Sequence, residues 1–340
     1  MKPLYYFTIF TTLLSCSLAF GQGADESPAG VMISHGHPKG QWMVTYNYMS
    51  QTMKTNLAGS GKIGDDAIFL NYIMAPQKMK MDMHMFMVMG GLTGKLSVMA
   101  TFNYNVLSMD MNMLPGSMMM HGMGGETSDM MTSKTSGLGD IRLIALYKLT
   151  NGEGSSLVLS GGLSIPTGSI NITGGENIMY DTLRLPYMMQ TGTGSLDFLP
   201  GLTYLKKSGK ITWSAQALSN LRVLNNSAGY HYGSDLTLNA WASYRFCPYF
   251  TASLRAENFY GGMISGKDSL IYQMMEPDAN PQNYGGDRLN IHLGCNFYIN
   301  KGAMQNSKIG LEFGLPVIQN LNGPQLATQF TLNAVLSKSF

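Results

Sequence analysis

The chain has 340 residues, of which only 12% are charged, and its formal net charge is +2. Soluble domains carry about 25% charged residues, and so small a net charge excludes a nucleic-acid-binding surface of the usual basic kind. No apolar run reaches the roughly 18 residues that a membrane helix needs. Sparse charge with 40 glycines and 18 tyrosines instead favours a membrane β-barrel.

The first 21 residues have the pattern of a signal peptide. Lys2 supplies the positive start, residues 4–14 form an apolar core, and Ala19-Phe20-Gly21 offers small residues for cleavage. An apolar core of about 11 residues is too short to cross a bilayer. We expect residues 22–40 to form an N-terminal periplasmic segment that is flexible or enters the lumen, and residues 41–340 to form the barrel.

Alternation of apolar and polar residues recurs from Trp42 to the last residue and predicts a transmembrane antiparallel up-and-down β-barrel of about twelve strands. In the predicted strand 210–224, Trp213 and Ala215 share one face while Ser214 and Gln216 share the other. A soluble sandwich alternates in the same way, so alternation alone leaves both folds open. The predicted strands are 41–53, 76–91, 95–109, 136–149, 156–168, 195–206, 210–224, 235–247, 249–260, 287–300, 307–317 and 325–340.

Connection lengths favour the barrel. Short connections at 92–94, 150–155, 207–209, 248 and 301–306 alternate with longer ones at 54–75, 110–135, 169–194, 225–234 and 261–286, and only 318–324 breaks the rule. Short periplasmic turns opposite long extracellular loops are typical of barrels in the outer membrane of a Gram-negative bacterium. An even strand number places both ends of the barrel in the periplasm.

Methionine is the most unusual feature of the composition, because 17 of the 29 methionines lie between Met74 and Met131. In the predicted strand 76–91, alternate methionines from Met79 to Met89 share one face, and Lys80, Asp82 and His84 share the other. Because charged side chains prefer a wet lumen, we expect this methionine face to contact lipid or to pack beneath a loop.

The following loop suggests metal binding. Thioether sulfur is a soft ligand that suits Cu(I), and an oxidising compartment disfavours thiolates. We therefore regard Cu(I) as the one candidate cofactor. Its candidate ligands are Met109, Met111, Met113, Met118, Met119, Met120, His121 and Met123.

Polar residues opposite the apolar strand faces are the candidate lumen lining, because a charge at bilayer depth must face water or a partner. Five arginines against three acids predict a positive bias that favours anionic or polar solutes. A ladder of ion pairs that blocks the lumen is the alternative. The set comprises Arg142, Asp197, Gln216, Asn220, Arg222, Arg245, Arg255, Glu257, Arg288, His292 and Glu312.

The predicted last strand carries Phe330, Leu332, Leu336 and the terminal Phe340 on one face, although Lys338 stands where an aromatic residue is usual. This ending resembles the signal that the outer-membrane insertion machinery reads. That machinery and outer-membrane lipid are therefore expected partners.

Five motifs together resemble a known family. They are HGHPKGQWMVTY at 35–46, SGLGDIRL at 136–143, LSIPTGSI at 163–170, MMQTGTGSLDFLPGLTY at 188–204 and AWASYRF at 240–246. In this order they resemble the transporter family named for the MetA pathway of phenol degradation. The resemblance implies an outer-membrane barrel with a transport role, and it brings neither a defined substrate nor catalytic residues.

Chemistry at an active site is not expected, because the chain has neither a G-x-S-x-G nucleophile motif nor the lysine of a phosphate-binding loop in its glycine-rich stretches. The sequence predicts a channel or transporter for small solutes through a polar lumen. The alternative is a copper-handling outer-membrane protein that uses the Met/His-rich loop. A structural or adhesive surface barrel would follow if the lumen were blocked.

Overall fold

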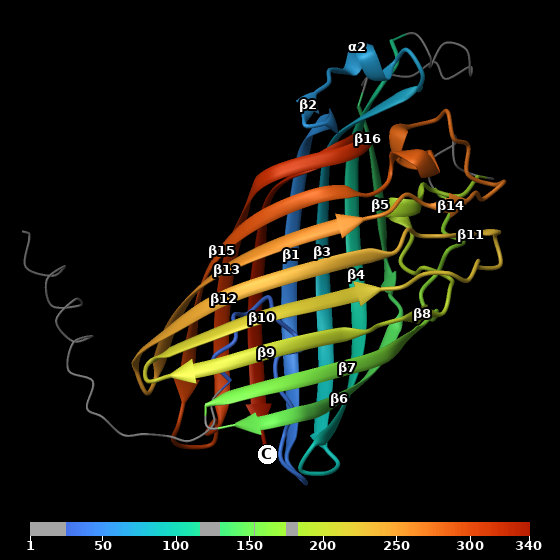
Figure 1. The fold of residues 1–340 in the computed structure, drawn as a ribbon. Coiled ribbons are helices and arrows are strands. Elements are labelled where there is room, and N and C mark those ends of the chain that lie inside the picture. Colours follow the sequence, from blue (N-terminus) through green and yellow to red (C-terminus); the bar gives the residue numbers. More distant parts are fainter. Residues whose placement is uncertain (1–24, 116–129, 153, 175–182) are drawn as a thin grey trace, which may run out of the picture.

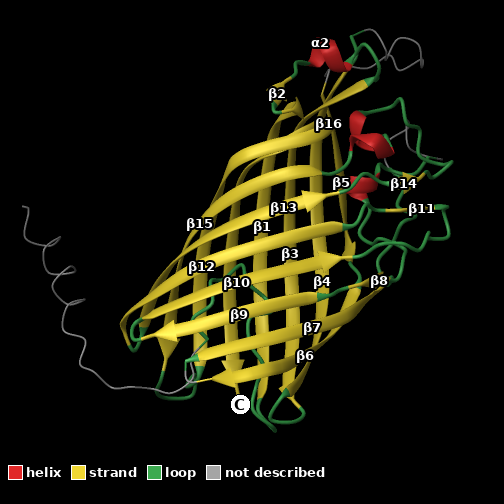
Figure 2. Cartoon of the chain, viewed as in Figure 1, coloured by secondary structure: helices red, strands yellow, loops and turns green. Residues whose placement is uncertain are grey.

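A computed structural model describes residues 25–115, 130–152, 154–174 and 183–340. Eleven strands pair antiparallel in chain order, and the last closes onto the first, so the wall is a complete barrel (Figures 1 and 2). The wall strands are β1 (Trp42–Gly59), β3 (Met74–Gly91), β4 (Leu96–Met113), β6 (Ile141–Gly152), β7 (Ser155–Ile165), β9 (Gly201–Ser208), β10 (Ile211–Asn220), β12 (Asp235–Cys247), β13 (Phe250–Gly261), β15 (Gly286–Ile299) and β16 (Ser307–Ser339).

The long β16 supplies two adjacent lengths of wall. Its first arm, 307–321, pairs with β15, and its second arm, 321–339, pairs with β1. The chain reverses near Gly323, and Phe313 of the first arm stacks on Phe330 of the second. When the two arms of β16 are counted separately, the closed wall consists of twelve antiparallel segments, the number that the sequence predicts. The predicted all-β membrane barrel is confirmed.

Short elements extend the wall at one rim. β5 (Met130–Leu138) continues the line of β6 along β4, and β8 (Asp197–Phe198) continues the line of β9 along β7. Pro200 separates β8 from β9 because proline has no N–H for the ladder. The remaining elements are β2 (Gly61–Lys62), α2 (Asp65–Ile68), η3 (Tyr187–Met189), β11 (Tyr230–His231), β14 (Ser265–Gly266), η4 (Pro277–Ala279) and η5 (Pro281–Asn283).

The two rims differ as the connection lengths predict. The turns after β3, β6, β9, β12 and β15 gather at one rim, and the long loops with α2, β11 and β14 gather at the other (Figures 1 and 2). We call these the short-turn rim and the long-loop rim. Among the described residues, no helix is long and apolar enough to cross a membrane.

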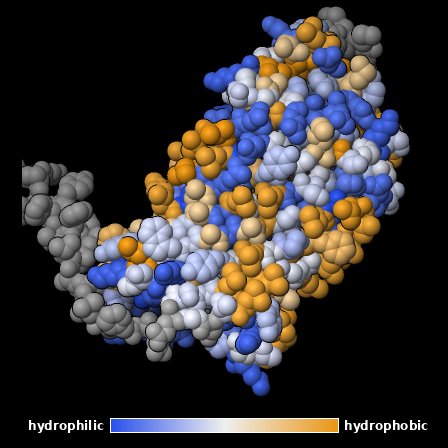
Figure 3. Space-filling model, viewed as in Figure 1, coloured by the Kyte–Doolittle hydropathy of each residue, from blue (hydrophilic) through white to orange (hydrophobic). Residues whose placement is uncertain are grey.

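Alternate residues divide the wall into an apolar outer face and a polar inner face. Large apolar side chains such as Trp213, Leu254 and Leu293 are exposed on the outside, whereas Gln216 and Arg255 are buried inside. Apolar residues gather over the visible wall in Figure 3, and hydrophilic residues are more frequent toward the long-loop rim. An outer face that contacts acyl chains explains this distribution.

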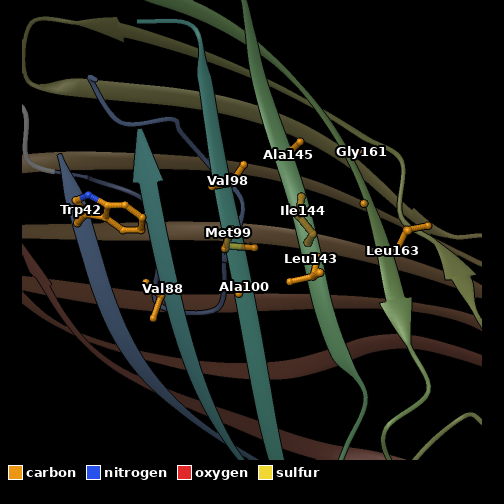
Figure 4. A pocket seen from close by; sticks show the side chains of 11 residues that line it. Trp42, Val88, Val98, Met99, Ala100, Leu143, Ile144, Ala145, Gly161 and Leu163 are labelled. Carbon is orange, nitrogen blue, oxygen red and sulfur yellow. The ribbon is translucent and has the colours of Figure 1, made fainter. Parts of the chain in front are cut away.

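One apolar hollow of about 510 Å³ interrupts the outer face across β1, β3, β4, β6 and β7 (Figure 4). Its base is made by small residues, Ala100, Ala145 and Gly161, and larger residues such as Trp42 and Leu163 stand at its edges. Small side chains beside large ones leave the hollow on a surface that lipid covers.

Candidate functional site

Residues 25–37, here called the lumenal segment, lie inside the barrel. The segment enters at the short-turn rim, rises into the lumen and returns to the same rim before β1 (Figure 1). Asn47 of β1 donates to the Ala29 carbonyl at 3.2 Å, and Thr203 of β9 donates to the Ile33 carbonyl at 3.1 Å. Because these strands lie on different sides of the barrel, the segment crosses the lumen between them.

Two acidic residues anchor the segment near the short-turn rim. Glu26 accepts hydrogen bonds from Lys207 at 2.8 Å, from Thr212 at 2.5 Å and from Arg245. Asp25 is paired with Lys308, and the hydroxyl of Tyr298 donates to its carbonyl. Charge-assisted bonds to buried acids are among the stronger polar contacts in proteins.

The middle of the segment contacts a buried ionic cluster made of Arg255, Glu257, His292 and Glu312. Arg255 is 1% exposed, and its guanidinium pairs with Glu257 and Glu312. His292 Nδ1 lies 3.2 Å from Glu312. A Cβ on Gly30 would lie 2.5 Å from both Arg255 and Glu312, so only glycine lets the backbone approach this closely. The cluster therefore holds the segment at mid-lumen.

A cavity of about 410 Å³ occupies the lumen on the side of the long-loop rim. One part of its lining, here called the methionine wall, consists of Met53, Met79, Met81, Met83 and Met188. Another part, the arginine wall, consists of Arg142, Arg222 and Arg288. The cavity thus offers both a soft apolar surface and positive charge.

The three arginines differ in their partners. Arg222 is neutralised by Asp197 at 3.2 Å and by Asp235 at 2.7 Å. Within the described part of the chain, neither Arg142 nor Arg288 makes an ion pair, and the Arg288 guanidinium lies 5.4 Å above the Phe259 ring. Two guanidiniums without an ion pair thus face the cavity, and its three lining arginines outnumber the two lining acids, Asp140 and Asp235.

An aromatic cluster of Tyr187, Tyr230, Tyr232 and Tyr284 covers the cavity at the long-loop rim. The Tyr187 ring meets Tyr230 edge to face at 4.7 Å between centroids and Tyr284 at 5.8 Å. Tyr284 also donates to the carbonyl of Asp278 at 2.6 Å. Burial raises the pKa of the Asp278 carboxyl to about 7, because the charged form is poorly solvated there.

The structure places all eleven predicted lumen residues on inward-facing positions, where they serve three different purposes. Arg142, Arg222 and Arg288 line the cavity. Gln216, which donates to the Ile33 carbonyl, and Arg245 hold the lumenal segment. The others are paired in the barrel interior: Asp197 with Arg222, Asn220 with Asp235, and Arg255, Glu257, His292 and Glu312 among themselves.

The expectation that the charged face of β3 lines the lumen and that its methionine face contacts lipid is wrong. Met79, Met85, Met87 and Met89 are buried inside the barrel, while the opposite face, with the exposed Phe86, points outward. Asp82 and Lys80 tolerate the outer face because they pair with each other at 2.7 Å. Tyrosine hydroxyls of β1 provide further hydrogen bonds to the polar side chains of this face. The Tyr48 hydroxyl donates to Asp82 at 2.7 Å, and the Tyr46 hydroxyl lies 2.8 Å from His84 Nδ1.

The candidate copper ligands fall into two groups. Met109, Met111 and Met113 do not lie in a loop, because β4 continues to Met113 and buries all three inside. The others lie outside the described residues: Met118, Met119, Met120, His121 and Met123. In the described ranges, no group of three His, Cys, Asp or Glu side chains is arranged to hold a metal.

Sequence reasoning missed the anchors of the lumenal segment. Asp25 and Glu26 are the only acids between residues 22 and 40, and this pair ahead of an apolar stretch was the available signal. These two residues add negative charge to the lumen, whose lining as predicted from the sequence has only three acids against five arginines. Asp235 was also missed, although it begins β12 on the same inward face as Asn239 and Arg245.

Comparison with known proteins identifies the family. The family model described as "Putative MetA-pathway of phenol degradation" matches residues 80–273, more than half of the chain. The chain belongs to this family. No curated protein matches it.

A solved structure shares the fold of this chain. The chain resembles the COG4313 outer membrane channel from Pseudomonas putida F1, with a TM-score of 0.61 and 15% identity over 91% of this chain and 98% of the channel. More distant matches are the KdgM porin, at a TM-score of 0.40 and 9% identity over 88% and 99% of the two chains, and the P. putida toluene transporter TodX, at 0.41 and 12% over 89% and 90%. This family member is a barrel of the Gram-negative outer membrane.

Proposed function

We propose that the chain is an outer-membrane channel for small organic solutes that combine an apolar body with an acidic group. The observation that carries this proposal is the lumen cavity, whose lining combines the methionine wall with two arginines that make no ion pair among the described residues and with more arginines than acids. A thioether surface favours apolar and aromatic groups, and a guanidinium favours carboxylates and sulfonates. Sugars satisfy neither surface.

The lumenal segment is the internal barrier of this channel. It lies on the short-turn side of the cavity and is tied by Glu26 to Lys207 and Arg245. A solute that has entered the cavity continues toward the periplasm only when the segment shifts. The segment therefore accounts for slow, selective passage rather than free diffusion through an open pore.

Proteoliposome swelling tests the solute class. Benzenesulfonate, benzyltrimethylammonium and arabinose cross a lipid bilayer slowly, so protein-dependent flux is measurable for each. We expect the aromatic anion to enter several times faster than the aromatic cation and faster than the sugar. Equal rates for the anion and the cation, or sealed liposomes with all three solutes, would reject the proposal.

Variants assign the selectivity to the cavity. Arg142→Gln combined with Arg288→Gln removes both cavity guanidiniums that make no ion pair among the described residues, and the anion should lose its advantage over the cation. Arg184→Gln is the matched control, because Arg184 pairs with Asp268 outside the cavity lining. An unchanged preference in the double variant contradicts the role of the arginine wall.

A further inference from the structure

Three methionines on adjacent strands stand side by side inside the barrel. Met53 of β1 lies opposite Met79 of β3, and Met79 lies opposite Met109 of β4 in the strand register. Directly opposite residues of antiparallel strands have Cβ atoms about 5 Å apart. The three side chains are 4%, 1% and 0% exposed and belong to one cluster. Their thioethers can therefore converge on one point.

More methionines surround this row. Met111 of β4 lies opposite Met131 of β5, and Met189 of η3 packs onto the same cluster from the long-loop rim. Eight of the eleven buried members of the cluster are methionines, and the other three are leucines. By contrast, the buried aromatic cluster at the long-loop rim contains none. Six of these eight methionines belong to β1, β3 and β4, so the enrichment is centred on the interior of these strands.

Packing alone does not account for this choice. Methionine is the flexible apolar residue, and branched side chains specify a core better. The row also does not lie in a closed core, because Met53 and Met79 line the cavity together with Met81. A ligand that enters the cavity can reach these sulfur atoms.

The chemistry of the row selects a soft monovalent cation. Thioethers are neutral, soft donors that bind Cu(I) and its analogue Ag(I) and have little affinity for Zn²⁺ or Mg²⁺. The two cysteines in the described residues do not join the row, since Cys247 is on β12 and Cys295 on β15. We propose that Met53, Met79 and Met109 form an intralumenal binding site for Cu(I) or Ag(I). This function goes beyond the passage of organic solutes.

The chain offers a matched control for this site. Met43, Met89 and Met99 form a second row in the same register across β1, β3 and β4. This row packs in a cluster with Ile33 of the lumenal segment, and none of the three lines the lumen cavity. It has the same donor atoms on the same strands without access from the cavity.

The experiment measures metal affinity on the full-length mature protein refolded in detergent. Ag(I) is titrated directly, and Cu(I) is titrated under anaerobic conditions against a chromogenic chelator. Met53→Leu, Met79→Leu and Met109→Leu are combined in one variant, because leucine conserves the volume of methionine in a core. Heat-dependent mobility on a denaturing gel checks that each variant forms the barrel.

We expect one tightly bound ion per wild-type chain and an affinity at least 10-fold lower in the triple variant. The control variant with Met43→Leu, Met89→Leu and Met99→Leu should bind like the wild type, and the methyl resonances of Met53, Met79 and Met109 should shift on addition of Ag(I). Wild-type affinity in the folded triple variant overturns the proposal. An equal loss in the control variant overturns it as well, because binding would then not depend on the row that faces the cavity.

Discussion

Releasing the lumenal segment should open the channel. Glu26 is 5% exposed and accepts hydrogen bonds from Lys207, Thr212 and Arg245. Removing one partner of a buried ion pair costs about 3–5 kcal/mol. The Lys207 side chain is 41% exposed, so solvent weakens its ion pair with Glu26. We therefore take the lower end of this range as the cost of Glu26→Ala. A cost of about 3 kcal/mol raises the ratio of released to docked segment by about 150-fold, at 1.36 kcal/mol for each tenfold change.

Single-channel recording in planar bilayers measures this ratio as the fraction of time spent in the larger conductance state. Moderate ionic strength of about 0.1 M keeps the electrostatic contribution visible. Glu26→Gln should lie between the wild type and Glu26→Ala, since the amide still accepts from Thr212 without carrying the charge. Asp66→Ala is the control, because Asp66 is an exposed residue of α2 outside the lumen. Identical traces for the wild type and Glu26→Ala would refute the barrier role of the segment.

Three further predictions follow from burial and charge. Arg255→Met removes the guanidinium that pairs with the buried Glu312 carboxylate and should lower the free energy of unfolding by about 3–5 kcal/mol. Urea titration in lipid vesicles measures this loss, and adding Glu312→Met should restore part of it. Leu293→Arg places a charge on an outer position that is 65% exposed and should cost about 2–4 kcal/mol near mid-membrane, so a neutral effect in the same titration contradicts the lipid-facing assignment. The Asp278 carboxyl has a pKa of about 7 in the folded loop against 3.8 in the unfolded chain. Because the unfolded chain releases this proton at lower pH, the stability of the loop falls as pH rises from about 4 to 7, by about 4 kcal/mol in all. Hydrogen exchange of residues 277–283 should show this slope in the wild type and a flat profile in Asp278→Asn.

The two faces of β3 show where sequence reasoning reached its limit. Alternation established that Met79 and Met89 share a face, but a period of two cannot say which face points inward. The rule that charges prefer the lumen chose the wrong side, because Lys80 and Asp82 neutralise each other and Tyr46 and Tyr48 supply hydroxyls from the neighbouring strand. Those partners become visible only when the register of β1 and β3 is known.

By itself, the sequence determined the antiparallel barrel and its place in an outer membrane, because alternation and turn spacing are local properties of the chain. The family followed from five local motifs. The inward positions of Gln216, Arg255 and His292 also followed from local alternation. Only the tertiary structure decided how the interior is used. It brought Glu26 to Arg245 across 219 residues of sequence, and it aligned Met53, Met79 and Met109 from three strands. Such contacts depend on strand register and on the path of the lumenal segment, which no local pattern encodes.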